Sequence, residues 1–265
     1  MPRRLSVDIV IPVYNEEAAI ATCVSRLRSF LEQEFAHEWK IIVANNGSKD
    51  RTLEIAKDLA AADPRVEVLN LDRKGRGLAL RTAWGKSSAD VVSYMDVDLS
   101  TNLVYFPLLV EGLHCGYDIA VGSRLMQASM VARRIKREVL SRGFNLLIRM
   151  LFWTKFSDAQ CGFKALRREA AQLLLPHVVN NSWFFDAELL ILAEKNGFRI
   201  FEAPVEWMED LDSRVHLSAT ALEDLRGLAR VRTSRVRLNL RRAGESALQM
   251  ETTRGAAKAG PGPRP

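Results

Sequence analysis

The chain has 265 residues, 48% of them hydrophobic, which suffices for one large domain with a core of its own. Its net charge of +6 favours anionic partners, namely nucleotide phosphates, lipid phosphates, an acidic membrane or nucleic acid. Three scattered cysteines exclude a disulfide framework, and there is neither an apolar leader nor an apolar run long enough to span a membrane, so we expect a cytoplasmic protein whose membrane contact is peripheral.

Through residues 7–95, short apolar runs alternate with stretches in which apolar residues have helical spacing. Strands are predicted at residues 7–13, 40–44, 66–71 and 90–95, and helices at residues 16–35, 51–62 and 77–86. This repeated β-α-β alternation predicts an α/β fold with a mostly parallel sheet and helices on both faces. In such sheets ligands bind beyond the carboxyl ends of the strands, and three polar clusters of this sequence fall there.

The remainder of the chain is predicted to elaborate the same domain. A basic amphipathic stretch, a loop with a strand, a helix closed by Gly197, a late strand, a polar loop and an Arg-rich helix are expected at residues 133–155, 157–168, 185–196, 199–208, 212–218 and 221–242. Beyond these, Gly, Ala, Pro and Arg dominate, which predicts disorder. We therefore expect one domain over residues 1–242, with halves of about 1–125 and 126–242, and a disordered tail at 243–265.

Asp96 and Asp98 directly follow the predicted strand 90–95. Alternation along a strand would point both carboxylates to the same side, and two like charges so close repel unless a cation lies between them. Oxygen ligands suit Mg²⁺ or Mn²⁺, which commonly bridge to substrate phosphates. The pair therefore predicts a metal site, and the plainer alternative is a solvated loop start.

Two further polar clusters stand at strand ends. Residues 45–52 open a helix, with Gly47 permitting a tight turn, and they are either a capped turn without a ligand or a loop that binds a base through the amide of Asn45. Residues 12–17 place acidic side chains in a first helical turn, which the helix dipole alone explains. The residues themselves leave both alternatives open.

The order of several motifs resembles that of the inverting GT-A glycosyltransferases. These motifs are Val-Ile-Pro-Val-Tyr-Asn-Glu at 10–16, Asn-Gly-Ser-Lys-Asp-Arg-Thr at 46–52, Arg-Lys-Gly at 73–75 with Gly77, and Asp-Val-Asp at 96–98. Segments 121–124, 136–145, 158–164 and 185–190 look like those of the dolichyl-phosphate mannose and glucose synthases. So many motifs in order over residues 7–216 make the resemblance specific. It implies a GT-A, Rossmann-like fold with amphipathic C-terminal helices, and a nucleotide-sugar half followed by an acceptor half.

The resemblance also implies roles for individual residues. For the nucleotide it implies Pro12, Tyr14, Glu16, Asn45, Lys74 and Asp96, and for a donor-bound Mg²⁺ or Mn²⁺ it implies Asp96 and Asp98. The catalytic set that it implies is Asp98 with Arg124, Arg137 and Ser141, the last three at phosphate groups of donor or acceptor. Acceptor contacts are implied for Arg137, Ser141 and Arg214, although Arg137 taken alone would be part of a solvated helix face.

The sequence departs from the family at three places. The usual acidic pair before Gly-Ser is replaced by Asn45 and Asn46, and since an amide cannot accept two donors as a carboxylate does, uracil is favoured over guanine as the base. Ser100 stands where a glutamine can assist the metal. Residues 212–217 match the family's acceptor loop only loosely, and the spanning helices that some relatives add are absent.

The predicted activity is transfer of a sugar from a UDP-sugar or GDP-mannose to a polyprenyl or dolichyl phosphate, with inversion. The metal and nearby arginines would balance the diphosphate charge, and a phosphate acceptor with a second pKa of about 6 needs no strong general base. A hydroxyl acceptor would need one, and Asp186 and Glu188 are the candidates on the acceptor side. The alternatives are a glycosyltransferase acting on a hydroxyl of a glycan and a nucleotide-sugar-binding protein without catalysis.

Two basic segments bear on location. One carries an apolar stripe that is either core or a membrane-facing surface, namely Phe144, Leu147, Ile148, Leu151 and Phe152. The other, residues 226–242, is rich in arginine, and each cation near an anionic surface adds about 1 kcal/mol to binding. No nucleic-acid-binding motif accompanies this charge, so we expect contact with the cytoplasmic face of a membrane and none with nucleic acid.

Overall fold

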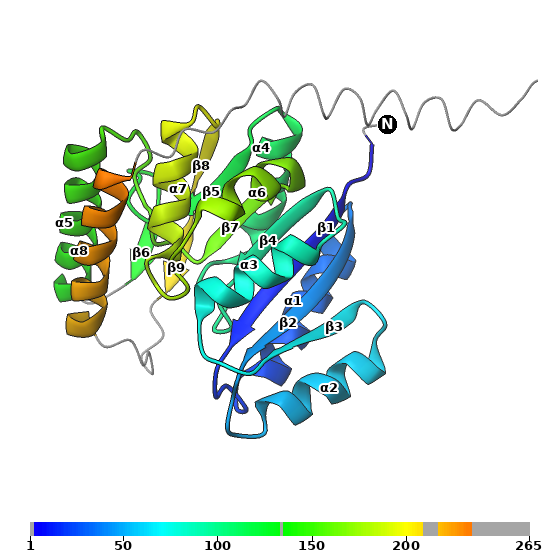
Figure 1. The fold of residues 1–265 in the computed structure, drawn as a ribbon. Coiled ribbons are helices and arrows are strands. Elements are labelled where there is room, and N and C mark those ends of the chain that lie inside the picture. The colour runs from blue at the N-terminus through cyan, green and yellow to red at the C-terminus, as the bar shows by residue number, and fades with distance from the viewer. Residues whose placement is uncertain (1–2, 133–134, 209–216, 235–265) are drawn as a thin grey trace, which may run out of the picture. The chain divides into compact units, whose positions relative to one another are not determined.

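The structure is a computed structural model that describes residues 3–132, 135–208 and 217–234 (Figure 1). A seven-stranded sheet has the order β3-β2-β1-β4-β7-β5-β8. Its strands are β1 Ser6–Val13, β2 Glu38–Asn46, β3 Val66–Leu71, β4 Val91–Met95, β5 Ile119–Ser123, β7 Phe163–Arg167 and β8 Ile200–Pro204. Neighbouring strands run parallel except at β7, which is antiparallel to both β4 and β5. The predicted mostly parallel sheet is therefore confirmed.

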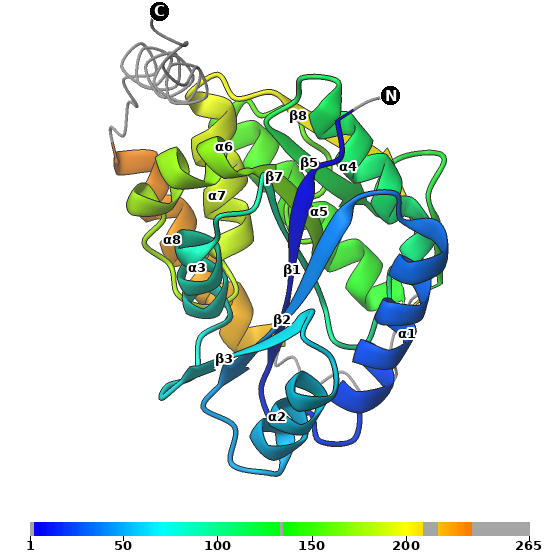
Figure 2. The same cartoon turned by 90° about the vertical axis from the view of Figure 1, so that its right-hand side faces the viewer.

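Helices cover both faces of this sheet, as predicted. Helices α1 and α4 lie on one face and α3, α6 and α7 on the other, while α2 packs on β3 and α8 packs against α5 and α7 (Figure 2). The helices are α1 Ile20–Glu34, α2 Thr52–Ala62, α3 Arg76–Lys86, α4 Phe106–His114, α5 Ile135–Phe152, α6 Arg168–Leu174, α7 Phe185–Lys195 and α8 Leu217–Thr233. Two short 3-10 turns, η1 Leu103–Tyr105 and η2 Leu175–His177, precede α4 and follow α6.

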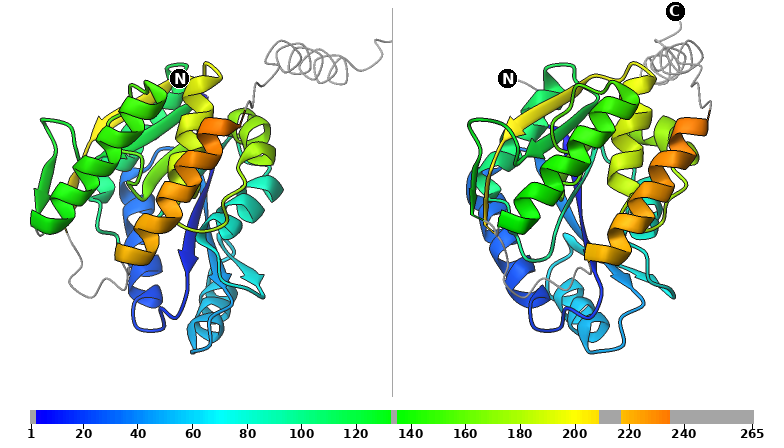
Figure 3. Two further views of the ribbon diagram at one scale, coloured as in Figure 1. Left: turned by 60° about the vertical axis from the view of Figure 1, so that its left-hand side comes forward. Right: turned by 90° about the vertical axis from the view of Figure 1, so that its left-hand side faces the viewer.

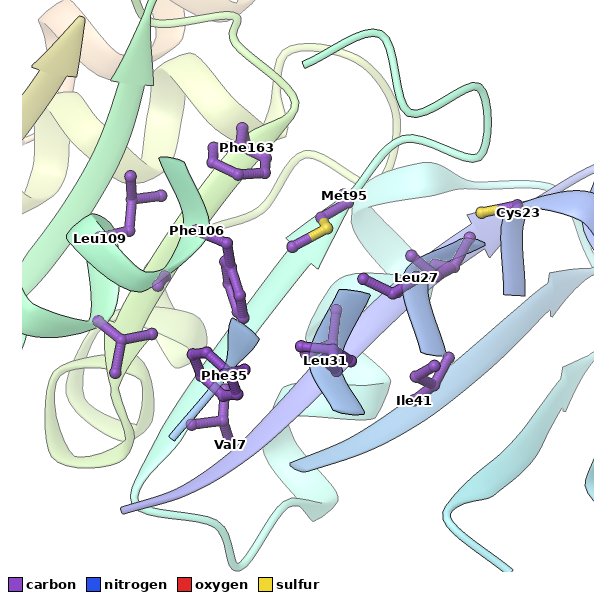
Figure 4. Packing of buried hydrophobic residues seen from close by; sticks show 14 of the residues in the cluster. Val7, Cys23, Leu27, Leu31, Phe35, Ile41, Met95, Phe106, Leu109 and Phe163 are labelled. Atoms are coloured by element: carbon purple, nitrogen blue, oxygen red, sulfur yellow. The ribbon is translucent and has the colours of Figure 1, made fainter. Parts of the chain in front are cut away.

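The core beneath α1 and α4 follows from the period-two alternation of the central strand. Alternate residues of β1 from Val7 to Val13 are almost fully buried and meet the apolar stripe of α1, of which Leu27 and Leu31 are members (Figure 4). The ring of Phe106 on α4 stacks on Phe35, with centroids 5.1 Å apart. Each such side chain contributes about 1.5–3 kcal/mol on burial, so this layer fixes the strands whose ends form the site.

The first helix begins later than its apolar spacing predicts, at Ile20 instead of residue 16. Residues 15–17 turn away from helical geometry because their backbone N–H groups are bonded by side chains of the loop at 48–52. Asn15 has φ 56°, in the left-handed region that asparagine tolerates better than most residues. The polar segment after β1 is therefore a loop held to its neighbour.

The second part of the chain differs from prediction in its strands. The late strand expected at 199–208 is two strands, β8 and the short β9 Glu206–Met208, which pairs with β6 Met130–Ala132 in a separate two-stranded sheet. The break follows Pro204, which has no backbone N–H to donate to the ladder. Helix α4 and strand β5 were not predicted as elements. The tail at 243–265 and the boundary at residue 242 lie outside the described residues and stay predictions.

Candidate active site

The carboxyl ends of β1, β2 and β4 meet at one edge of the sheet. Because β1 pairs in parallel with both neighbours, the segments that follow Val13, Asn46 and Met95 leave the sheet side by side. These segments are the three polar clusters of the sequence. Their predicted convergence is therefore confirmed.

Side chains tie the first two segments together. The N–H of Glu16 donates to Thr52 Oγ1 at 2.8 Å, and the N–H of Asn15 donates to Ser48 Oγ at 3.0 Å. In return the N–H of Lys49 donates to Asn15 Oδ1 at 2.8 Å. Glu16 and Lys49 also line a hollow of about 380 Å³ between the two segments. Of the residues near β1 that were assigned to a nucleotide pocket, Glu16 thus borders this hollow, while Pro12 is half-buried near the end of the strand.

The side-chain amide of Asn45 is already hydrogen-bonded within the protein. Its Nδ2 donates to Asn70 Oδ1 at 2.8 Å, and its Oδ1 accepts the N–H of Ser48 at 3.3 Å. The next residue behaves differently, because Asn46 is 4% exposed and its Oδ1 has no hydrogen-bond partner among the described residues. A buried amide oxygen without a partner costs free energy unless a ligand supplies a donor. Asn46 is thus better suited than Asn45 to meet a donor group of a base.

Tyr14 and Lys74, both predicted at the nucleotide, are neighbours in space. The Nζ of Lys74 lies 4.2 Å from the centroid of the Tyr14 ring, which is cation–π distance. One residue comes from the end of β1 and the other from the loop before α3, so two separate motifs of the sequence meet here. An aromatic face and an ammonium group together suit a base or a diphosphate.

Asp96 and Asp98 differ in their surroundings. Asp98 is exposed, and its Oδ1 accepts the N–H of Ser100 at 2.9 Å. The side chain of Asp96 is 42% exposed and forms an ion pair with Arg76, whose Nη2 lies 2.9 Å from Oδ1. Burial raises the pKa of Asp96, the nearby Asp98 adds to the rise, and the Arg76 guanidinium opposes it. A divalent cation would oppose it further.

Arg76 connects Asp96 to a buried charge cluster behind it. Its Nη1 lies 3.0 Å from Asp186 Oδ2, and Lys164 Nζ lies 2.9 Å from Asp186 Oδ1. The hydroxyl of Tyr94 donates to the same Oδ1 at 2.5 Å. Sequence reasoning missed Arg76, Lys164 and Tyr94 as site residues. The available signal for Arg76 was its place between Gly75 and Gly77 in a quoted motif.

The carboxylate pair fits a divalent cation. Gly162 supports Asp96 closely, because a Cβ at that position would stand 1.7 Å from Asp96 Oδ2. The hydroxyl of Ser100, two residues from Asp98, is buried and has no hydrogen-bond partner among the described residues. The described residues hold no group of three or more His, Cys, Asp or Glu that could bind a metal. The protein side of such a site is therefore two carboxylates, and Mg²⁺ or Mn²⁺ sites with few carboxylates usually complete their shell with water and substrate phosphates.

Arg124, predicted at a phosphate group, is engaged within the fold. Its guanidinium forms a bidentate ion pair with Asp158, in which Nε lies 2.7 Å from Oδ2 and Nη2 lies 3.0 Å from Oδ1. Burial alone would raise the pKa of Asp158, but Arg124 and the backbone N–H donors outweigh it and lower the pKa to about 2. Arg124 thus fixes the segment that leads to Gly162, and a phosphate contact by it stays a prediction.

The acceptor-side residues are only partly described. Ser141 on α5 is 9% exposed, and its hydroxyl has no hydrogen-bond partner among the described residues. Arg137 lies one helical turn earlier on α5, where only its backbone is described, and Arg214 lies outside the described residues. Helical spacing places residues 137 and 141 on the same face. The Ser141 hydroxyl is thus a buried polar group without a hydrogen-bond partner among the described residues, and its contact with an acceptor phosphate stays a prediction.

Asp186 and Glu188, the candidates for a general base, are both buried in ion pairs. Asp186 accepts from Tyr94, Lys164 and Arg76 as described above. Glu188 accepts the N–H of Asn180 at 2.8 Å and pairs with Arg230 on α8 at 2.5 Å. Carboxylates bonded to this many donors hold the structure together. A base at either position has no support in this geometry.

The apolar stripe predicted on the basic stretch is core. Ile148 and Phe152 are 0% and 5% exposed, while Phe144, Leu147 and Leu151 are half-buried. Of the two alternatives for this stripe, core or membrane face, the core interpretation is therefore correct. No helix among the described residues is long and apolar enough to cross a bilayer.

Comparison with known proteins identifies relatives of this fold and site. The family model described as glycosyl transferase family 2 matches residues 8–175. Glycosyltransferase AglD of Haloferax volcanii is 41% identical over 219 residues, which are 80% of this chain but 35% of that protein. Dolichyl-phosphate beta-glucosyltransferase ALG5C of Trichomonas vaginalis is 33% identical, over 82% of this chain and 68% of that protein. The chain thus spans about a third of the length of one relative and two thirds of the other.

Solved structures share the fold. Glucosyl-3-phosphoglycerate synthase from Mycobacterium tuberculosis in complex with UDP has a TM-score of 0.64 at 21% identity, covering 86% of this chain and 80% of that one. The same enzyme with Mn²⁺, UDP-glucose and phosphoglyceric acid has a TM-score of 0.66 at 19% identity, covering 86% and 80%. At these identities the likeness establishes the fold, which is the GT-A fold that the motifs imply.

Proposed function

Because the chain belongs to glycosyl transferase family 2, we propose that it transfers a sugar from a nucleotide-sugar donor to a polyprenyl or dolichyl phosphate, with inversion at the anomeric carbon. The observation that carries the proposal is the exposed Asp98 beside Asp96, which is held by Arg76, at the sheet edge where Tyr14 and Lys74 pair. We take UDP-glucose as the first donor to test, because relatives with this resemblance are named dolichyl-phosphate beta-glucosyltransferases.

The donor would lie across the ends of β1, β2 and β4. Tyr14, Lys74 and the unpartnered oxygen of Asn46 would receive the nucleotide. Asp96 and Asp98 would hold Mg²⁺ or Mn²⁺ on the donor diphosphate, and a bound cation would supply charge balance for the departing nucleoside diphosphate. Arg76 would fix the orientation of Asp96, since its guanidinium is bonded on both sides by carboxylates.

The acceptor chemistry explains the absence of a free base among the described candidates. An oxygen of the acceptor phosphate forms the new bond to the anomeric carbon while the bond from that carbon to the diphosphate breaks, and no proton has to be removed. A phosphate monoester with a second pKa of about 6 is already largely a dianion near neutrality. Transfer to a glycan hydroxyl would need a base, and the engagement of Asp186 and Glu188 in ion pairs disfavours that alternative.

The acceptor would reach the site from α5. The Ser141 hydroxyl and, one turn earlier, Arg137 would receive its phosphate. A lipid acceptor implies peripheral contact with a membrane, for which we propose the cytoplasmic face. The chain's net charge of +6 is compatible with an anionic surface there.

Radiolabel transfer tests the proposal. The purified protein is incubated with Mn²⁺ or Mg²⁺, a polyprenyl phosphate and, in separate tubes, labelled UDP-glucose, UDP-N-acetylglucosamine or GDP-mannose, and label extracted into organic solvent is counted. We expect metal-dependent label from UDP-glucose that is lost in Asp98→Asn and kept in Asp58→Asn, an exposed aspartate on α2. Nucleotide-sugar binding with label on a glycan but none on the lipid phosphate would overturn the acceptor assignment.

A further inference from the structure

An exposed tryptophan stands beside the arginine that holds Asp96. The guanidinium carbon of Arg76 lies 5.1 Å from the centroid of the Trp183 ring and 4.9 Å from that of Tyr94, both within cation–π distance. The Tyr94 ring is fully buried, whereas Trp183 is 39% exposed. We propose that the sugar ring of the donor packs on Trp183, and that this contact determines how tightly the sugar is held. The inference rests on the proposed function, because it assumes a nucleotide-sugar donor.

The loop that carries this tryptophan is bonded to a helix on either side of it. Residues 178–184 lead into α7 and run between α3 and α8, as the left panel of Figure 3 shows. On one side the carbonyl of Asn181 accepts the N–H of Leu78 on α3 at 3.1 Å. On the other side Asn180 Nδ2 donates to Glu223 Oε1 on α8 at 2.9 Å. The tryptophan is therefore presented from a backbone whose position is already fixed.

Two glycines at the start of α3 allow this loop to approach closely. A Cβ on Gly75 would stand 2.7 Å from the carbonyl oxygen of Asn181, and a Cβ on Gly77 would stand 2.8 Å from that of Asn180. Both separations are shorter than van der Waals contact, so a side chain at either position would displace the loop. Arg76 stands between these glycines, and the close approach therefore also brings the tryptophan to its guanidinium.

Trp183 lies on the side of the carboxylate pair where the sugar of a bound donor is expected. The residues proposed for the nucleotide come from the ends of β1 and β2, and the proposed metal ligands follow β4. The first turn of α7 lies beyond them, because Asp186 bonds Tyr94 on β4 and Lys164 on β7, the next strand of the sheet. A diphosphate on the metal joins the nucleoside to the sugar, so the sugar extends toward β7 and the start of α7.

An aromatic ring suits the face of a sugar. A pyranose carries hydroxyls around its edge, but its faces present C–H groups that can pack on an aromatic ring and leave water. A tryptophan offers this area at low entropic cost because it has only two side-chain torsions.

Covering Arg76 does not by itself account for Trp183. The Arg76 side chain is 12% exposed, and its charge is already met by Asp96 and Asp186. Single exposed aromatic residues are normal on protein surfaces, so exposure alone would carry little weight. Its place on a fixed loop, next to the arginine that orients a proposed metal ligand, is what assigns Trp183 to the donor.

Isothermal titration with two ligands tests the assignment. The parent and variants at Trp183 are titrated with UDP and with UDP-glucose, each with Mn²⁺ and without an acceptor. We expect Trp183→Ala to weaken binding of UDP-glucose about tenfold and of UDP less than about twofold, because only UDP-glucose has a sugar to pack on the ring. Trp183→Phe keeps an aromatic face and should recover most of the loss. Trp183→Leu keeps apolar bulk over Arg76 without a flat ring, and should lose nearly as much as Trp183→Ala.

Trp39→Ala is the matched control. Trp39 is also a partly exposed tryptophan next to a guanidinium, since the Arg65 guanidinium carbon lies 4.2 Å from its ring centroid. It stands at the start of β2, at the opposite end of that strand from the site. Its replacement should leave the Kd of both ligands within about twofold of the parent values.

The outcomes separate this contact from the proposed function. Equal weakening of UDP and UDP-glucose would show that the ring only supports Arg76 and Asp96, and would overturn the proposal. Unchanged binding of both ligands would overturn it as well, and a raised KM for the polyprenyl phosphate would then assign the ring to the acceptor. A loss confined to UDP-glucose, in a protein whose parent makes no lipid-linked product, would support the contact and count against the proposed acceptor alone.

Discussion

Arg76 joins two carboxylates that are far apart in the sequence. It bonds Asp96 at the rim of the site and Asp186 beneath it, and its own side chain is only 12% exposed. A guanidinium suits this place because its planar fork can hold two carboxylates at once while staying charged. The orientation of Asp96 therefore depends on a residue that has no direct place in the Asp-x-Asp motif.

Replacing Arg76 with alanine is expected to lower the free energy of unfolding by about 2–3 kcal/mol, because it leaves two partly buried carboxylates without their shared cation. Arg76→Lys keeps the charge but cannot bridge both partners, so an intermediate loss is expected. Urea denaturation measures both. Arg73→Ala, at an exposed arginine of the loop before α3, serves as the control and should change stability by less than about 0.5 kcal/mol. An Arg76→Ala protein as stable as this control would show that the bridge contributes nothing.

Substitution of Gly162 distinguishes an effect on ligand binding from an effect on the stability of the fold. A Cβ there would stand 1.7 Å from Asp96 Oδ2, so Gly162→Ala should displace the carboxylate and weaken metal-dependent UDP binding by tenfold or more, on the order of 1.4 kcal/mol. Isothermal titration with UDP and Mn²⁺ measures this. Gly143→Ala on α5 meets nothing within 4 Å and should leave UDP binding unchanged while stabilising the helix by about 0.5–1 kcal/mol. Unchanged binding in Gly162→Ala would remove the argument that Gly162 supports a metal ligand.

At the scale of elements, two side-chain contacts join α8 to segments near the site. Arg230 bonds Glu188 on α7, and Gln160, in the segment between Asp158 and Gly162, donates to Asp224 Oδ2 at 3.3 Å. Asp224 is 5% exposed, and its Oδ1 has no partner among the described residues. Burial, with repulsion from Glu223, raises its pKa to about 7.

The raised pKa of Asp224 predicts a pH dependence of stability. The folded protein binds this proton more tightly than the unfolded chain, whose carboxyl has the ordinary value of 3.8, so the free energy of unfolding should fall as pH rises from about 4 to about 7 and then level off. Asp224→Asn should remove this fall and be more stable than the parent above neutrality by on the order of 1–3 kcal/mol. Urea denaturation across this pH range measures it, with Asp58→Asn as an exposed control. A parent and an Asp224→Asn protein with parallel pH profiles would contradict the assignment.

Helices and strands with strong local sequence patterns could be predicted, but the elements against which they pair or pack could not. Strand β3 has the predicted bounds, since its β-branched and other apolar residues stand between turn residues on either side. The antiparallel direction of β7 between β4 and β5 is set by the path of the chain, which local sequence does not encode. Helical spacing also predicts that α5 is amphipathic without showing what its apolar stripe packs against, and this left core and membrane as alternatives.

In the site, too, local features could be predicted from the sequence and long-range contacts could not. The two carboxylates after β4 could be predicted from their place at a strand end, where a parallel sheet gathers its loops, and the resemblance implied that Tyr14 and Lys74 both lie near the nucleotide. The engagement of Arg124 by Asp158 could not be predicted, because it depends on a partner 34 residues away that only packing brings close. Long-range ion pairs of this kind leave no periodic signal in the sequence.

At the scale of the whole molecule, the site spans elements from β1 to α7, so a ligand bound there should stabilise the fold as a unit. With UDP and Mn²⁺ at about 100 times their Kd, linkage predicts about 2.7 kcal/mol of added stability. Because the proposed metal site has two carboxylates as its protein ligands, Asp96 and Asp98, neither Mn²⁺ alone nor UDP with a chelator should reach this value. Thermal unfolding without ligand, with Mn²⁺ alone, with UDP and a chelator, and with UDP and Mn²⁺ measures it.

Asp98→Asn tests the linkage in the same experiment. Asp98 is exposed and accepts a hydrogen bond from the backbone N–H of Ser100. The Asp98→Asn variant should therefore unfold like the parent without ligand and lose the part of the stabilisation that requires Mn²⁺. Stabilisation by UDP that is the same with chelator, with Mn²⁺ and in Asp98→Asn would mean that the carboxylate pair takes no part in holding the diphosphate. The donor would then be held by the cations of the site, Lys74 first among them, and the role assigned to Asp96 and Asp98 would be wrong.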